Sequence, residues 1–183
     1  MKIAVYCSSR ENINSQYKES AQIIGECIGK HAATLVYGGV DKGLMSIVSQ
    51  AVRNAGGHTV GIVPAMRQNL RNTCDNEMIL SSDLNDRKAK MLRMSNLFIV
   101  LPGGYGTLDE FVSTYTSLTF EQDAAKQIIL LNQNGIYDAT MAQFQKMIEE
   151  GMMEKELLHR VKVATSAQEC CSMIDEFIKN NRP

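Results

Sequence analysis

Residues 96–110 read Asn-Leu-Phe-Ile-Val-Leu-Pro-Gly-Gly-Tyr-Gly-Thr-Leu-Asp-Glu, and this stretch decides the fold. The apolar run 96–101 is typical of a strand buried on both faces of a parallel sheet. A Pro-Gly-Gly-x-Gly turn follows it, and residues from about 107 to 119 then show a helical pattern. A strand that passes through a glycine-rich turn into a helix is the usual ligand-binding unit of open α/β sheets.

The rest of the chain repeats this alternation of short apolar runs and helical patterns. Strands are expected near residues 3–7, 34–37, 59–63, 78–80, 128–131 and 161–164, and helices near 15–31, 44–55, 83–95, 137–150 and 166–179. Parallel strands need crossovers, which are almost always right-handed. The sequence therefore predicts an α/β, Rossmann-like, doubly wound fold with a mainly parallel sheet and helices on both faces, built as one domain over residues 1–183.

Composition excludes several classes of function. The chain has 183 residues, a net charge of −1 and no basic block, so we expect no nucleic-acid surface. Its five cysteines form no Cys-x-x-Cys pair and its three histidines lie far apart along the chain, so we expect no metal site. The odd number of cysteines and the lack of a signal or membrane-spanning segment predict a cytoplasmic protein with reduced thiols that does not bind membranes.

Two strand ends carry glycine-rich turns, and both point to an anion. Glycine allows the backbone N–H groups to approach a ligand closely, and a helix N-terminus adds a partial positive charge. Thr107 could cap the helix after the second turn while offering its hydroxyl. We expect a phosphate to bind here, in a substrate site that includes these residues at the ends of three strands: Ser8, Gly38, Gly39, Gly103, Gly104, Tyr105, Gly106 and Thr107.

Two charged clusters flank the second turn. Asp109 and Glu110 lie near the start of its helix, where acids often only complement the helix dipole. We accept that interpretation for Asp109, but expect Glu110 to face the bound sugar. In the second cluster, residues 83–88, either Asp83 or Asn85 could cap the next helix, and Arg87 or Lys88 could reach the phosphate or ribose.

These residues resemble a known family. Residues 102–110 match the PGGxGTxxE motif of the Lonely Guy (LOG) family, the cytokinin riboside 5′-monophosphate phosphoribohydrolases, long labelled lysine decarboxylases. The segment 37–45 is similar to the family's GGGxxGLMG segment, and 83–91 resembles its Arg-Lys stretch. Residues 130–138 resemble its LLN…GYYD stretch, so the resemblance runs through almost the whole chain.

The resemblance implies an activity and a set of roles. It implies that Arg87 and Glu110 are the catalytic pair, and that Lys88, the loop 103–107 and Thr116 line the nucleotide site. It also implies a homodimer that uses no metal and no NAD. The implied reaction cleaves the N-glycosidic bond of a nucleoside 5′-monophosphate, AMP or an N6-substituted cytokinin nucleotide, to free base and ribose 5-phosphate.

The sequence departs from the family pattern mainly on the side that recognises the base. Val40 and Ser46 replace glycines of the first motif, and Gln68 with Asn69 stands where many members carry a glutamate. A non-catalytic nucleotide or cofactor carrier on the same fold remains the alternative function, because fold alone does not fix function. A dehydrogenase is disfavoured because no GxGxxG follows the first strand. A lysine decarboxylase is disfavoured because no lysine has a convincing pyridoxal-phosphate context.

Overall fold

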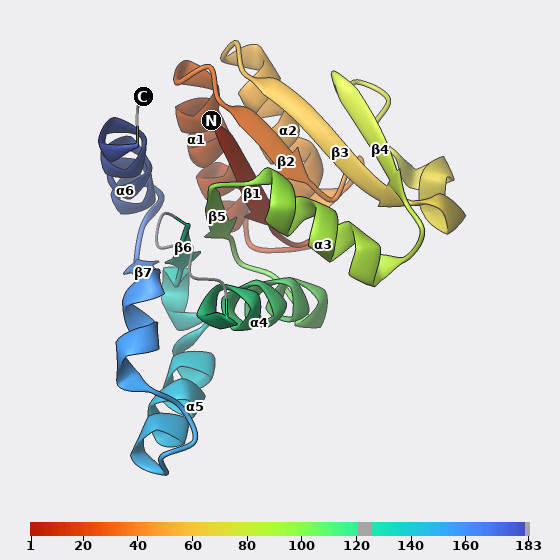
Figure 1. Ribbon diagram of the computed structural model, residues 1–183. Helices are drawn as coiled ribbons and strands as arrows, with labels where there is room; N and C mark the ends of the chain where they lie inside the picture. Colours follow the sequence, from red (N-terminus) through yellow and green to blue (C-terminus); the bar gives the residue numbers. More distant parts are fainter. Residues whose placement is uncertain (121–125, 182–183) are drawn as a thin grey trace.

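The sheet at the centre of the protein is parallel throughout, as predicted. The computed structural model describes residues 1–120 and 126–181, and its seven strands lie in the order β4-β3-β2-β1-β5-β6-β7 (Figure 1). The strands are β1 (Lys2–Tyr6), β2 (Thr34–Tyr37), β3 (His58–Pro64), β4 (Glu77–Ser81), β5 (Leu97–Val100), β6 (Gln127–Leu131) and β7 (Val161–Ala164). The predicted α/β class is therefore confirmed.

The connections are mostly helical. The helices are α1 (Ser15–Lys30), α2 (Gly43–Asn54), α3 (Leu84–Met94), α4 (Tyr105–Phe120), α5 (Asp138–Glu149) and α6 (Ala167–Asn180), with short 3₁₀ helices at Ala65–Leu70, Gln133–Gly135 and Lys155–Arg160. α5 extends away from the sheet at one end of the molecule (Figure 1). Among the described residues, no helix has both the length and the apolar character needed to cross a membrane.

Strand order explains why the apolar runs show no polar alternation. β1 lies between β2 and β5, so Ile3 pairs with Leu35 on one side and Leu97 on the other. Side chains of these central strands are buried on both faces, which a parallel sheet with two helical layers requires. The chain winds outward in opposite directions from β1 and β5, and ligands of doubly wound sheets bind at this switch point.

Successive side chains of β1 enter two different cores. Ile3 and Val5 pack in the core that α1, α2 and α6 cover. Ala4 and Tyr6 pack in the opposite core with Met91 of α3 and residues of α4 and α5. Helices therefore cover both faces of the sheet, as the sequence predicted.

The ends of two helices correct one prediction and decide between the two alternatives of another. The helix expected from about residue 107 begins at Tyr105, so Thr107 lies inside its first turn and is not its cap. The glycine turn before α4 therefore ends at Gly104, two residues before its predicted end. At α3 the side chain of Asp83 accepts the N–H of Asp86, so Asp83, not Asn85, is the cap.

Candidate active site

A cleft of about 910 Å³ opens beyond the carboxyl ends of β1 and β5, at the switch point of the sheet. The loop after β1, the start of α3 and the start of α4 form most of its wall. Its lining includes eight of the predicted site residues together with Asp109: Ser8, Arg87, Lys88, Gly104, Tyr105, Gly106, Thr107, Asp109 and Glu110. Its volume is of the size that binds small organic ligands.

Arg87 and Glu110 meet in the wall of this cleft. Arg87 Nη2 donates to Glu110 Oε1 at 2.8 Å, joining the first turn of α3 to the second turn of α4. The side chains are 14% and 8% exposed, so solvent screens the pair weakly. Arg87 Nε is buried without a hydrogen-bond partner among the described residues, which leaves a donor of this guanidinium free.

Burial changes the charge of Glu110 near neutral pH. Loss of solvent raises the pKa of its carboxyl from 4.5 to about 7, although the Arg87 guanidinium and the Lys88 ammonium both act to lower it. The Asp109 carboxylate nearby adds to the rise. A carboxyl with a pKa near the working pH can exchange protons in both directions, which suits general acid–base chemistry.

Asp109 has a more specific partner than the helix dipole. Lys88 Nζ donates to both Asp109 carboxylate oxygens at 2.8 and 2.9 Å, and to Ser113 Oγ at 3.1 Å. The dipole interpretation of Asp109 is therefore incomplete, because its carboxylate bridges α4 to Lys88 of α3. Both residues also line the cleft, next to the Arg87–Glu110 pair.

Tyr6 and Cys7 lie close to the pair at the end of β1, and Cys7 also lines the cleft. Tyr6 Oη and Thr114 Oγ1 share a hydrogen bond of 2.8 Å, which ties β1 to α4. Burial raises the pKa of the Tyr6 hydroxyl and of the Cys7 thiol well above their usual ranges. The raised pKa values keep both groups protonated at neutral pH, whereas the pKa of Glu110 lies near 7.

Gly38 leaves space for the end of the Arg87 side chain. A Cβ at Gly38 would overlap Arg87 Nη2 and contact Met45, so the turn after β2 leaves room for the guanidinium. Gly104 and Gly106 instead face open space at the start of α4. The first N–H groups of a helix have no partner within it, so this open end of α4 presents donors to an anion.

Some predicted residues lie outside the lining. Gly39 packs its backbone against Gly61, and Gly103 packs against Thr107, so both shape the turns from behind. Thr116 is exposed on α4 and does not line the cleft.

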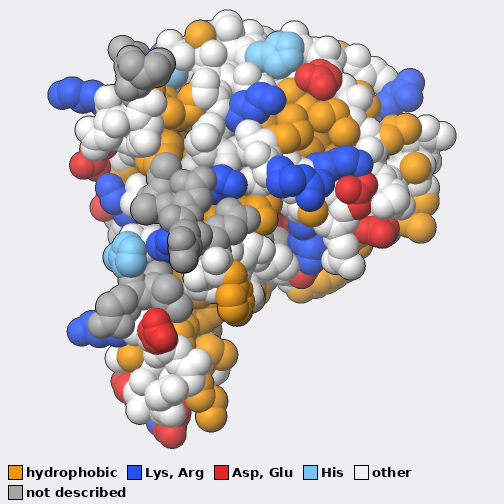
Figure 2. Space-filling model, viewed as in Figure 1, with side chains coloured by type: hydrophobic (Ala, Val, Ile, Leu, Met, Phe, Trp, Pro, Cys, Tyr) orange, Lys and Arg blue, Asp and Glu red, His pale blue; other side chains and the backbone are white. Residues whose placement is uncertain are grey.

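Sequence reasoning missed three cations of the lining, Arg10, Lys42 and Arg67. Arg10 follows β1, Lys42 follows β2 and Arg67 lies in the 3₁₀ helix after β3, so the rule that ligands bind beyond strand ends could have found them. With Arg87 and Lys88 they outnumber the acids of the lining, Glu11, Asp109 and Glu110. On the face seen in Figure 2, Lys and Arg side chains lie near Asp and Glu side chains. Positive charge is thus concentrated locally in the cleft.

Comparison with known proteins identifies a family model and curated relatives. A family model described as "Possible lysine decarboxylase" matches residues 45–174. Cytokinin riboside 5′-monophosphate phosphoribohydrolase LOG1 of Arabidopsis thaliana is 34% identical over 181 residues, which cover 97% of this chain and 84% of the relative. The probable enzyme LOG6 of the same plant is 35% identical, with 98% and 90% covered.

Solved structures show the same fold. The molybdenum cofactor binding protein from Rippkaea orientalis superposes with a TM-score of 0.73 at 24% identity, covering 97% of this chain and 96% of that one. The molybdenum cofactor carrier protein from Chlamydomonas reinhardtii gives a TM-score of 0.74 at 18% identity, covering 97% and 98%. Fold is shared across these proteins, whereas the near-full-length sequence match is to the plant enzymes. The chain belongs to the LOG family of phosphoribohydrolases, the family whose model carries the lysine decarboxylase description.

Proposed function

We propose that this protein hydrolyses the N-glycosidic bond of a nucleoside 5′-monophosphate, AMP or an N6-substituted cytokinin riboside monophosphate, to free base and ribose 5-phosphate. The observation that carries the proposal is the Arg87–Glu110 pair, half enclosed in a cationic cleft at the switch point of the sheet. The plant relatives named for this activity match nearly the whole chain.

The phosphate would bind where the cleft is most positive. The N–H groups at the start of α4, around Gly104 and Gly106, suit an anion, and Arg10 and Lys42 add full charges from the loops after β1 and β2. A phosphate held there places the ribose toward Glu110, which lies one turn further along α4. No metal is needed to balance the charge of this phosphate.

The reaction breaks the C1′–N bond while water adds its hydroxyl to C1′ and the leaving base takes up a proton. Such a cleavage passes through a transition state with oxocarbenium character, as glycoside hydrolysis does. The ionised carboxylate of Glu110 would stabilise that positive charge and accept the proton of the attacking water. Arg87 would hold Glu110 in place and add positive charge to the cleft, since a guanidinium is too basic to donate its proton readily.

The base would be recognised on the side of the cleft where the sequence departs from the family pattern. Arg67 lines it from the 3₁₀ helix Ala65–Leu70, which also carries Gln68 and Asn69. These amides replace the glutamate found in many members of the family. We propose that this segment sets the preference between adenine and N6-substituted adenines.

A non-catalytic carrier is the competing function, because the Chlamydomonas protein that carries molybdenum cofactor has the same fold. A carrier needs the glycine turn and the cations but gains nothing from a buried carboxyl held against an arginine. Burying the Glu110 carboxyl costs stability, and carboxyls with such strongly shifted pKa values are found most often at catalytic sites. The Arg87–Glu110 pair therefore favours hydrolysis.

Incubation of the purified protein with AMP and with N6-isopentenyl AMP tests the proposal, with free base followed by chromatography. Release of base that is lost in Glu110→Gln supports a phosphoribohydrolase, and the ratio of the two rates gives the base preference. Tight binding of nucleotides without release of base would overturn the proposal in favour of a carrier.

We also propose a homodimer. Large apolar side chains are exposed on and near α4, with Tyr105 88% and Phe120 84% exposed, and Met152 is 82% exposed beyond α5. Such side chains commonly cover each other in interfaces between copies of a chain. Light scattering after size exclusion checks this, and a monomer at micromolar concentration would contradict it.

A further inference from the structure

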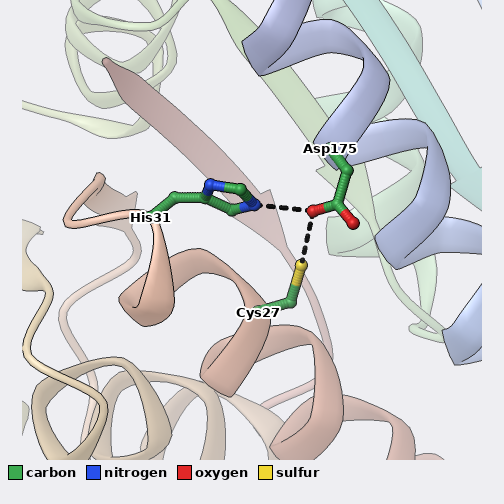
Figure 3. A group of neighbouring side chains, drawn as sticks. All are labelled: Cys27, His31 and Asp175. Carbon is green, nitrogen blue, oxygen red and sulfur yellow. Dashed lines mark hydrogen bonds and ion pairs between the residues drawn. The ribbon is translucent and has the colours of Figure 1, made fainter.

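Three potential metal ligands lie together between α1 and α6. Cys27 is in the last turn of α1 and His31 follows that helix, while Asp175 is in α6 (Figure 3). His31 Nε2 lies 2.6 Å from Asp175 Oδ1, and Cys27 Sγ lies 3.8 Å from the same oxygen. All three ligand atoms lie within 4.8 Å of one another, so the fold joins residues that are far apart in sequence.

Local helix geometry explains how the ligands come together. Cys27 and His31 are four residues apart, which places them on the same face of a helix, one turn from each other. α1 and α6 pack side by side over the same core, and α6 brings Asp175 against that face. The sequence argument against a metal counted ligand pairs along the chain and did not consider ligands from two different helices.

The distances fit a tetrahedral zinc ion after a small adjustment. Zinc binds sulfur at about 2.3 Å and histidine nitrogen or carboxylate oxygen at about 2.0–2.2 Å, so its ligand atoms lie roughly 3.3–3.8 Å apart. The Cys27–Asp175 separation already lies in this range. The His31–Asp175 contact would open by roughly 0.7 Å on the same geometry, a shift that the exposed Asp175 side chain can make, being 59% exposed.

Charge and ligand type also point to zinc. A thiolate, a neutral imidazole and a carboxylate together carry two negative charges, which a divalent ion neutralises. Mixed sulfur, nitrogen and oxygen ligands favour zinc over magnesium or calcium, which bind oxygen. Water can complete the fourth position from the solvent side, because His31 and Asp175 are both partly exposed.

We propose that Cys27, His31 and Asp175 form a zinc-binding site that fastens α6 to the end of α1. The site lies away from the cleft, because His31 immediately precedes the turn into β2 at the amino edge of the sheet, whereas the cleft is at the carboxyl edge. Zinc here would stabilise the fold by holding two helices together, and it would take no part in the reaction at Glu110.

Metal binding by the full chain tests this proposal. The protein is stripped with a chelator under a thiol reductant, then dialysed against Zn²⁺, and bound zinc is measured with the melting temperature. We expect one zinc per chain and a higher melting temperature. Each of Cys27→Ser, His31→Gln and Asp175→Asn should weaken binding by more than about tenfold, since even losses of groups that only support ligands cost 10–100-fold.

Two matched controls separate the site from adventitious binding. Cys74→Ser and His58→Gln remove an exposed cysteine and an exposed histidine that lie outside the cluster, and we expect both to bind zinc as the unaltered protein does. Equal loss in the controls, or full binding in all three site variants, would overturn the proposal. So would the absence of bound zinc in the unaltered chain.

Cobalt provides a readout that does not depend on the folding of any variant. Co²⁺ in the unaltered protein should give the intense visible bands of tetrahedral coordination and a thiolate-to-cobalt charge-transfer band. A weak octahedral spectrum would show that Cys27 does not bind the metal, and the cluster would then be an ordinary His31–Asp175 ion pair. None of these measurements depends on phosphoribohydrolase activity, so the two proposals fail separately.

Discussion

Arg87 Nη2 lies 2.8 Å from Glu110 Oε1, although the two residues are 23 positions apart and belong to different helices. α3 and α4 flank β5, and each begins near the carboxyl edge of the sheet. The contact therefore depends on two helix starts converging at the switch point. A change that moves one helix start relative to the other should lower the catalytic rate more than it lowers the stability of the fold.

Glu110→Gln should reduce kcat by about 10²–10³-fold, because one well-aimed electrostatic group contributes on that order. The amide keeps the shape of the carboxyl but loses its negative charge and its proton affinity. We expect KM to change much less, since phosphate and base bind elsewhere in the cleft. Steady-state release of base measures both constants.

Glu149→Gln is the matched control for this substitution. Glu149 is exposed on α5 and hydrogen-bonds only Gln145 among the contacts described. Its activity should equal that of the unaltered enzyme. Full turnover in a folded Glu110→Gln protein would remove Glu110 from its proposed role.

Activity should depend on pH through Glu110. Burial raises the pKa of its carboxyl to about 7, so the carboxylate needed to stabilise the transition state forms as pH rises through that value. We expect kcat/KM to fall about tenfold for each pH unit below it, and to level off above it. A profile flat from pH 5 to 8 would show that the ionised form is not required.

Stability should change with pH in the opposite direction. A folded pKa above the unfolded value of 4.5 means that the native state binds the proton more tightly. The stabilisation that this proton gives is complete below pH 4.5 and is lost as pH rises through about 7. Urea unfolding at pH 6 and 8 should show this decrease for the unaltered chain, and a smaller one for Glu110→Gln.

Most of the fold could be predicted because it depends on local patterns. The run 96–101 and the glycine turn after it identify a buried strand and the start of a helix without any tertiary information. Arg87 and Glu110 could be named as a pair because the resemblance links two motifs. The helix begins at Tyr105, two residues before the predicted start, because a glycine turn does not itself show which peptide begins the helix.

The rest depends on residues that approach one another only in the folded chain. Arg10, Lys42 and Arg67 reach the cleft from segments after three different strands, and only their place beyond strand ends distinguishes them from surface charges in the sequence. The partner of Asp109 and the raised pKa of Glu110 likewise depend on the packing of α3 against α4. Sequence patterns give positions along elements, whereas these properties depend on distances between elements.

Two glycine substitutions should distinguish the glycine that leaves space for Arg87 from the glycine that leaves space for the substrate. In Gly38→Ala the new methyl group would displace the Arg87 guanidinium, so kcat should fall. In Gly104→Ala the methyl group meets open space, so the melting temperature should stay near that of the unaltered chain while KM rises, because the methyl group would obstruct the phosphate. Kinetics and thermal unfolding of both variants check this. An unchanged KM in Gly104→Ala would place the phosphate elsewhere.

Asp75→Ala should destabilise the fold by about 3–5 kcal/mol, because removing one partner of a buried ion pair leaves the others unsatisfied. The Asp75 side chain is 1% exposed, accepts the Tyr37 hydroxyl at 2.8 Å and lies 3.1 Å from Arg53 Nη1, so it joins the segment before β4 to β2 and α2. Glu150→Gln, which removes the exposed pair with Lys146, should cost less than about 0.5 kcal/mol. Urea unfolding measures both losses. Equal losses would mean that burial adds nothing to the Asp75 contacts.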